Sequence, residues 1–153
     1  MNSLQINLIL QRSHYTKKCF KGVYPSNRIR KYSTYPYCMV ANSDKEGQRG
    51  THWLGIFVPN PNTVEYFDSF AEPPNAVIKK FLDQFETIVV NSRQVQSIFD
   101  NSCAAHVIYF LISRSKGMPF NTIIKRLTLE KPFSDSFVKL YVWNLITSHH
   151  QQQ

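Results

Sequence analysis

Cys103 is the side chain in this 153-residue sequence with the clearest chemical potential. Three residues of the types that cap a helix N-terminus precede it: Asp100, Asn101 and Ser102. An apolar run at 104–112 follows and predicts a buried helix, so Cys103 is expected in its first turn. Unpaired N–H groups and the helix dipole lower the pKa of a thiol there and favour the reactive thiolate. The alternative is a small core residue, since cysteine is often buried.

A histidine and an aspartate occupy matching ends of a predicted β-hairpin. The strand-forming residues 53–58 are followed by a Pro-Asn-Pro-Asn turn and by further strand formers at 64–70. His52 precedes the first strand and Asp68 lies in the second, so the two are expected roughly opposite one another. The carboxylate would accept the Nδ1–H of the imidazole and leave Nε2 free as a base. Together with Cys103 they match a Cys–His–Asp arrangement, although such His–Asp neighbours also occur in sheets without a function.

The rest of the chain predicts an α+β fold with a small, mainly antiparallel sheet packed against helices. The helix that begins at Cys103 is expected to end near Gly117 and Pro119. We expect one domain over 1–153, with 1–18 and 148–153 peripheral or frayed. The other expected elements are an amphipathic segment at 4–10, irregular structure at 20–27, a strand at 37–41, a polar loop at 42–50, a helix from Pro73–Pro74 to about 85, a strand at 88–90, and helices at 120–127 and 134–147.

The composition is that of a globular chain with unevenly placed positive charge. Hydrophobic residues make up 42% and charged residues 18%, which argues against intrinsic disorder. No apolar run approaches the ~20 residues of a membrane-spanning helix. The net charge is +8, and residues 1–50 carry +7 of it, from nine Lys/Arg against two acidic residues. This basic third, interleaved with tyrosines, could bind DNA, and a solvated basic face without a partner is the alternative.

The three cysteines, Cys19, Cys38 and Cys103, are too few and too scattered for a disulfide framework and fit a reducing compartment. The first residues have no basic region typical of a signal peptide, so an intracellular location is expected. A zinc site formed by His14, Cys19, Cys38 and His52 would lack the paired close spacings of zinc ligands.

Five blocks of the sequence, within residues 19–120 and in the same order, resemble the adenovirus-type cysteine proteases (adenain), including relatives encoded by Maverick/Polinton-type elements. They are Cys-Phe-Lys-Gly-Val-Tyr-Pro at 19–25, Gly-Thr-His-Trp-Leu at 50–54, the turn Asn60-Pro61, Tyr-Phe-Asp-Ser-Phe at 66–70, and Gln96 separated by six residues from Cys103 within Asn-Ser-Cys-Ala-Ala.

The resemblance implies a papain-like core, with histidine before cysteine in chain order, and a cysteine endopeptidase activity. It makes Cys103 the nucleophile, His52 its general base and Asp68 the carboxylate that orients His52. Gln96 would donate its side-chain amide to the oxyanion beside the Cys103 backbone N–H, a contribution typically of ~3 kcal/mol. Without the resemblance, Gln96 would be interpreted as a surface polar residue. The implied substrates are viral or mobile-element precursor polyproteins cut next to small residues such as Gly, in virions or the host nucleus.

The sequence departs from this family at three points. Asp68 stands where the best-known viral members carry Glu, and Ala104 stands where Gly is usual, so a positive φ at residue 104 would be costly. The adenoviral enzyme is joined to its peptide activator by a disulfide, and this linkage cannot be carried over, because 85–95 contains no cysteine. No cofactor is required that the sequence shows, and DNA or a peptide remains the activator that the family implies.

The expected partners are a protein substrate and, through the basic third, DNA, with no membrane and a monomeric chain. One alternative is a protease that deconjugates SUMO or ubiquitin-like proteins; those enzymes usually leave five residues between Gln and Cys and have Asp-Cys-Gly at the nucleophile. The other alternative is a catalytically decayed basic module that binds nucleic acid, for which Ala104 is the specific argument.

Overall fold

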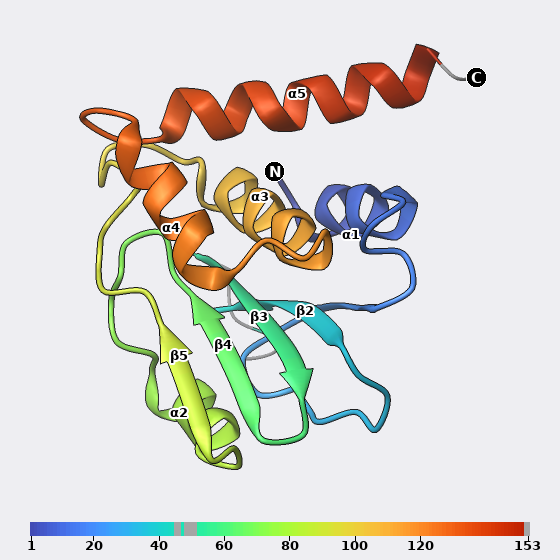
Figure 1. The fold of residues 1–153 in the computed structure, drawn as a ribbon, viewed down its shortest axis with the longest axis vertical. Coiled ribbons are helices and arrows are strands. Elements are labelled where there is room, and N and C mark those ends of the chain that lie inside the picture. The colour runs from blue at the N-terminus through green and yellow to red at the C-terminus, as the bar shows by residue number, and fades with distance from the viewer. Residues whose placement is uncertain (45–46, 48–51, 152–153) are drawn as a thin grey trace.

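The computed structural model describes residues 1–44, 47 and 52–151, and side chains as far as residue 148. The predicted loop at 42–50 therefore lies largely outside the described residues. In chain order the elements are α1 (Ser3–Arg12), β1 (Phe20–Tyr24), β2 (Tyr37–Asn42), β3 (Trp53–Asn60), β4 (Thr63–Phe67), α2 (Ala76–Leu82), β5 (Thr87–Val90), α3 (Cys103–Ser115), α4 (Phe120–Leu129) and α5 (Asp135–Gln151) (Figure 1).

The strands form one five-stranded sheet in the order β1-β2-β3-β4-β5. The two central pairings, β2–β3 and β3–β4, are antiparallel, whereas the outer pairings β1–β2 and β4–β5 are parallel. The α+β class is confirmed, but the sheet is mixed where the sequence predicts a mainly antiparallel one. Before each parallel pairing the chain has to return to the starting end of the sheet, through residues 25–36 for β2 and through α2 for β5.

β1 occupies part of the segment that sequence analysis expects to be irregular. Gly22 and Pro25 suggest that expectation, yet Phe20–Tyr24 pairs with β2. Gly22 has a φ of 122°, and the register with β2 shifts between Phe20 and Val23. Only glycine takes such a conformation readily, so the strand contains an irregularity at Gly22 and continues beyond it.

Alternate residues of the central strands enter two separate hydrophobic cores, one on each face of the sheet. Cys38, Val40, Phe57 and Phe67 belong to the core that also contains residues of α1, α3, α4 and α5. The other core contains Met39, Ile56, Val58 and Tyr66 together with residues of α2.

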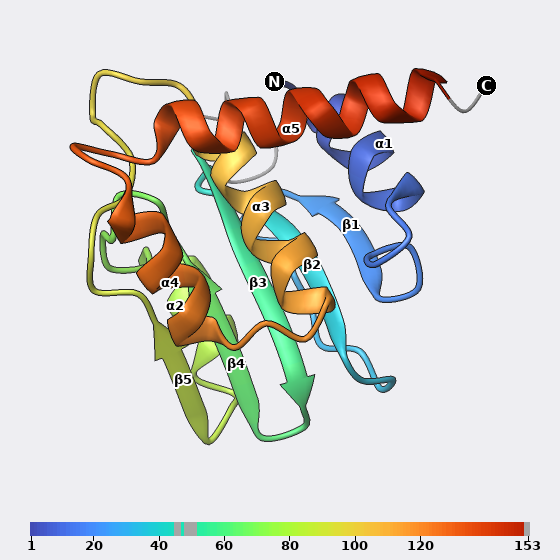
Figure 2. The same ribbon diagram turned by 45° about the horizontal axis from the view of Figure 1, so that its top comes forward.

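α3 is the central helix and crosses the sheet over β2 and β3 (Figure 2). Its residues 104–113 are buried, as the apolar run predicts. Gly55 of β3 allows this close approach: a Cβ added there would lie 3.2 Å from Cδ1 of Phe110 and 3.4 Å from Cγ1 of Val107. Gly55, three residues after His52, is thus needed for the close packing of α3, the helix that begins with Cys103.

The N-terminal segment is less peripheral than the sequence suggests, and α5 packs on the same core. Ile6 and Leu10 of α1 are fully buried in the α3-side core, so residues 1–18 are not a peripheral arm. α5 continues to Gln151 and covers α3. Tyr109 of α3 makes edge-to-face contacts with Phe137 and Tyr141 of α5. The apolar side of each terminal helix thus completes the core around α3.

α2 begins later than the Pro73–Pro74 pair predicts. Its first residue is Ala76, and the Asn75 side chain accepts a hydrogen bond from the Ile78 backbone N–H at 2.9 Å. A residue before a proline is kept out of the helical region, and Asn is a preferred N-cap, so the helix begins after the prolines.

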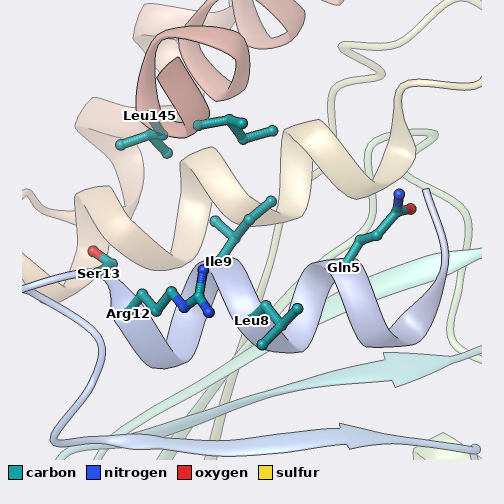
Figure 3. A pocket seen from close by; sticks show the side chains of 7 residues that line it. Gln5, Leu8, Ile9, Arg12, Ser13 and Leu145 are labelled. Carbon is teal, nitrogen blue, oxygen red and sulfur yellow. The ribbon is translucent and has the colours of Figure 1, made fainter. Parts of the chain in front are cut away.

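A pocket of about 340 Å³ lies between α1 and α5 (Figure 3). Its lining residues are Gln5, Leu8, Ile9, Arg12, Ser13, Leu145 and Ile146. None of the four candidate site residues lines it. No helix in the described part of the chain has the length and apolar character needed to cross a bilayer.

Candidate active site

Cys103 is the first residue of α3, as predicted, and is partly buried. The predicted capping does not occur: Ser102 occupies the N-cap position, but its hydroxyl makes no capping hydrogen bond. Instead, Ser102 Oγ donates to Asp135 Oδ1 at 3.2 Å. The Ser102 side chain therefore does not occupy the N–H groups of the first turn.

The hairpin places His52 and Asp68 next to each other at the end remote from its turn. β3 and β4 pair in antiparallel register, with Gly55 opposite Phe67. His52 directly precedes β3 and Asp68 directly follows β4, so the two side chains meet, with His52 Nε2 2.6 Å from Asp68 Oδ1. Both are largely shielded, with 14% and 5% of their side-chain surfaces exposed.

The ring nitrogens have the opposite roles from those predicted. Asp68 contacts Nε2, so Nδ1 is the nitrogen left to face Cys103. Asp68 Oδ1 also accepts a hydrogen bond from the Phe70 backbone N–H at 2.9 Å, which fixes the carboxylate at the end of β4. The pairing of strands predicts that His52 and Asp68 lie opposite each other, but it does not predict which ring nitrogen of His52 contacts the carboxylate.

Phe70 covers one face of the imidazole. The two rings are stacked at a centroid distance of 4.7 Å and an interplanar angle of 23°. Ala71, directly after Phe70, has a φ of 55°, and its N–H donates to the Asp68 carbonyl at 2.8 Å. A left-handed alanine is strained, and such strain is often found in turns that support functional sites. The turn thus keeps Asp68 and Phe70 in place against His52.

His52 and Cys103 shift each other's pKa toward an ion pair. Burial alone would lower the pKa of His52, but hydrogen bonds to Asp68 and Cys103 outweigh it and raise that pKa to about 9. Burial would raise the pKa of Cys103, but hydrogen bonds to His52 and to the Trp53 backbone lower it. Both shifts favour the thiolate–imidazolium form over the neutral pair, and the thiolate is the nucleophilic form of cysteine.

Gln96 is fully buried and belongs to the same region without a described hydrogen bond to His52 or Cys103. Its Oε1 accepts from Ser69 Oγ, and its Nε2 donates to the Asp100 carbonyl at 2.9 Å. The surface alternative for Gln96 is thus wrong. One amide hydrogen remains after the bond to Asp100, and an amide fixed at both ends is a preorganised donor.

Asn91, at the end of β5, is a functional candidate that the sequence analysis missed. Its Oδ1 accepts from the Asp68 backbone N–H at 3.0 Å, and its Nδ2 donates to the Asp68 carbonyl at 2.6 Å. The next residue, Ser69, makes further contacts between the two segments, because its carbonyl accepts hydrogen bonds from the backbone N–H groups of Val95 and Gln96. The segment that carries Asp68 is therefore tied to the segment that carries Gln96. The parallel β4–β5 pairing brings them together, and no local sequence pattern indicates it.

The chain is similar to viral proteases in sequence and in fold. No protein-family model matches the sequence. A protein of Acanthamoeba polyphaga mimivirus that is named as a thiol protease is 25% identical over an alignment of 96 residues, which covers 56% of this chain and 32% of that protein. A crystal structure of the ASFV protease pS273R superimposes with a TM-score of 0.65 at 14% identity, covering 90% of this chain and 64% of that one. A selenomethionine structure of the same protease gives a TM-score of 0.59 at 14% identity, covering 81% and 61%.

The fold is that of a papain-like viral protease, and the sequence is similar to a viral thiol protease. This chain spans about a third of the mimivirus protein and less than two thirds of the ASFV protease. The matches support a viral cysteine protease in general and do not single out the adenovirus type.

A second buried histidine, also missed by the sequence analysis, supports the start of α3. His106 is fully buried, with Nδ1 2.9 Å from the Ser102 carbonyl and Nε2 2.8 Å from Ser134 Oγ. Burial is the main cause that lowers the pKa of His106, so the ring is held neutral. Ser134 Oγ in turn donates its hydrogen to the Val95 carbonyl at 2.8 Å, so His106 links the start of α3 to the residue that precedes α5. Asp135, the first residue of α5, accepts hydrogen bonds from the Ser102 hydroxyl and from the Ser97 backbone N–H. It thereby joins α5 to the residue before Cys103 and to the residue after Gln96.

The zinc alternative is not assembled in the structure. Cys19 and Cys38 are neighbours, but His52 is engaged by Asp68 and His14 packs against Tyr15. In the ranges 1–44 and 52–148, no group of three or more His, Cys, Asp or Glu side chains has an arrangement that could hold a metal ion.

Proposed function

We propose that this chain is a cysteine endopeptidase in which Cys103, His52 and Asp68 form the catalytic triad. The observation that carries the proposal is the thiol at the N-terminus of α3 beside an imidazole that Asp68 holds at 2.6 Å. The raised pKa of His52 and the lowered pKa of Cys103 both favour the reactive ion pair. The similarity to viral proteases supports the protease activity in general.

In this mechanism the Cys103 thiolate attacks the carbonyl carbon of a peptide bond. The oxyanion of the tetrahedral intermediate is stabilised by the Cys103 backbone N–H and by Nε2 of Gln96. The His52 imidazolium gives its proton to the leaving amine, which breaks the C–N bond and leaves a thioester. Neutral His52 then deprotonates a water molecule, and the hydroxide hydrolyses the thioester and restores the thiolate. Asp68 keeps the ring oriented throughout and stabilises its charged form.

The proposed substrates are precursor proteins of a virus or mobile element, cleaved next to small residues of the Gly type, as the adenain resemblance implies. DNA or a peptide is the proposed activator, and the basic residues of the first fifty are the proposed DNA-binding surface. Lys21 and Arg30 of that surface lie over the Tyr32 ring, at 5.3 and 5.0 Å from its centroid. Aromatic rings between exposed cations suit a nucleic-acid backbone with adjoining bases.

Digestion of a denatured peptide library, with cleavage sites read by mass spectrometry, tests the proposal without a known substrate. The full chain is incubated with the library with and without duplex DNA, and the new peptide ends are compared with those from Cys103→Ala. We expect new ends next to small residues in the parent digest alone. His14→Ala is the matched control, because it removes a histidine outside the site and should leave cleavage unchanged.

Three outcomes separate the alternatives. New ends that persist in Cys103→Ala would remove Cys103 as the nucleophile. Cleavage restricted to a folded SUMO or ubiquitin-like conjugate, added as a second substrate, would favour the deconjugating class. No cleavage under any condition, together with an unreactive Cys103 and retained DNA binding, would favour the decayed basic module.

A further inference from the structure

Cys19 and Cys38 form a close pair of thiols that the proposed reaction does not use. Cys19 directly precedes β1, and Cys38 lies in β2 opposite Phe20. The Cys38 N–H donates to the Cys19 carbonyl at 3.0 Å, which fixes the two backbones side by side. Their Sγ atoms are 3.8 Å apart. A shift of less than 2 Å would bring the sulfurs to the bonding distance of about 2.05 Å between adjacent strands.

The two thiols differ in exposure and acidity. Cys19 is 8% exposed, whereas Cys38 is fully buried behind it. The hydrogen bond from Cys38 is the main cause that lowers the pKa of Cys19 to about 6, and Ser115 and Lys21 act in the same direction. The same hydrogen bond, together with burial, raises the pKa of Cys38. Cys19 is therefore the thiolate that meets an oxidant first, and Cys38 is the protonated partner beside it.

We propose that Cys19 and Cys38 are a reversible oxidation site, at which a peroxide converts the two thiols into an intramolecular disulfide. The Cys19 thiolate attacks one peroxide oxygen, the O–O bond breaks, and Cys19 becomes a sulfenic acid while the peroxide is reduced to water or an alcohol. The Cys38 sulfur then attacks the Cys19 sulfur, the S–O bond breaks, and the hydroxyl leaves as water with the Cys38 proton. A dithiol such as dithiothreitol reverses the change by thiol–disulfide exchange.

The geometry keeps this site apart from Cys103. Cys19 contacts Ser115, at the C-terminal end of α3, with Sγ 3.6 Å from its Oγ. Cys103 is at the other end of the helix, twelve residues before Ser115, which places the two ends about 18 Å apart along the helix axis. Cys103 therefore cannot resolve an oxidised Cys19. The proposal does not depend on the proteolytic function, since it concerns the pairing of β1 with β2.

Oxidation should stabilise the fold. The disulfide would close a loop that holds β1 and residues 25–36, the connection through which the chain returns for its parallel pairing. Cross-links over loops of this length restrict the unfolded chain, so the oxidised protein should melt at a higher temperature than the reduced one.

The experiment exposes the folded full chain, in the Cys103→Ala background, to hydrogen peroxide. Remaining thiols are blocked with N-ethylmaleimide in denaturant, and the protein is digested without reduction. We expect a cross-linked peptide pair containing Cys19 and Cys38, lighter by two hydrogens than its parts, and its disappearance after dithiothreitol. The Tm should rise by several degrees on oxidation and return on reduction.

Cys38→Ala is the matched variant, because alanine preserves an apolar side chain in the core. In it Cys19 should be trapped as a sulfenic acid by dimedone, with no intramolecular cross-link. The proposal is overturned if both thiols stay alkylatable at a peroxide dose that oxidises Cys103 in the unaltered chain. It is also overturned if Cys19 is cross-linked only to a second copy, or is oxidised to sulfinic acid while Cys38 stays free. These readouts require the unaltered pair alone, so they stand even if Cys38→Ala fails to fold.

Discussion

Replacing His52 by alanine should remove the low-pH reactivity of Cys103. The substitution deletes the hydrogen bond and the positive charge that lower the pKa of Cys103, while the burial that raises it remains. At pH 6.5 an ordinary thiol with a pKa of about 8.5 is about 1% thiolate. The limiting case is a Cys103 held wholly as thiolate: it would expose about 100-fold more of the reactive form, while its lower basicity would reduce the intrinsic reactivity by about tenfold. We therefore expect His52→Ala to be alkylated more slowly at pH 6.5, by at most about tenfold.

The assay is the rate of iodoacetamide labelling at Cys103, followed by mass spectrometry of its peptide from pH 5 to pH 9. In the parent the labelling rate should rise at a lower pH than in His52→Ala, where it should rise only toward pH 9. His14→Ala serves as the control, since the exposed His14 ring contacts Tyr15 and lies outside the site. Circular dichroism of each variant checks that the fold is retained.

Superimposable pH profiles for the parent and His52→Ala would refute the ion pair. The hydrogen bond between His52 and Asp68 would then be a structural contact only. Repeating the labelling with duplex DNA separates an inactive site from one that needs an activator, because an activator would restore the difference between the two proteins.

Three further perturbations test the surrounding groups. Gln96→Ala should lower kcat by ~10²–10³ with little change in KM, while Ser69→Ala, which keeps the amide, should retain most of the activity; a loss confined to KM would make Gln96 a substrate-binding residue. Asn91→Ala should destabilise the fold by about 1–3 kcal/mol in urea unfolding, because both backbone groups of Asp68 lose a buried partner, and an unchanged midpoint would argue against that clamp. The kcat/KM profile should fall as pH rises through about 9, because the raised pKa of His52 keeps the imidazolium protonated up to that pH. The imidazolium is the proposed proton donor to the leaving amine. A fall of kcat/KM near pH 6.5 would instead show an unperturbed ring.

The parts of this structure that the sequence predicts well are those set by short-range pattern. The hairpin follows from the strand-forming residues on either side of a Pro-Asn-Pro-Asn turn, and β3 and β4 lie where this pattern indicates. The start of α3 at Cys103 follows from the apolar run after polar residues. Since the hairpin alone brings His52 to Asp68, the pair could be found before any tertiary information was used.

The parts that it does not predict are pairings between distant segments. The parallel pairing of β1 with β2 depends on how residues 25–36 return along the sheet, and no residue within β1 indicates it. The clamp of Asn91 on Asp68 and the contact of His106 with Ser134 depend on the same kind of long-range placement. The sequence pattern likewise does not indicate which nitrogen of His52 meets the carboxylate.

Ala104, directly after the proposed nucleophile, has a different conformation from the one that the sequence argument considers. A glycine is usual at this position in the family that the sequence resembles, and the objection to Ala104 is that a positive φ there would be costly. Ala104 is instead the second residue of α3, buried in the helix–sheet core, and among the described non-glycine residues only Ala71 has a positive φ. A helical backbone accepts alanine better than any other residue, so the substitution costs no strain and favours the start of α3. The specific argument for a decayed site therefore disappears, and the reactivity of Cys103 depends on His52 and on the first-turn N–H groups.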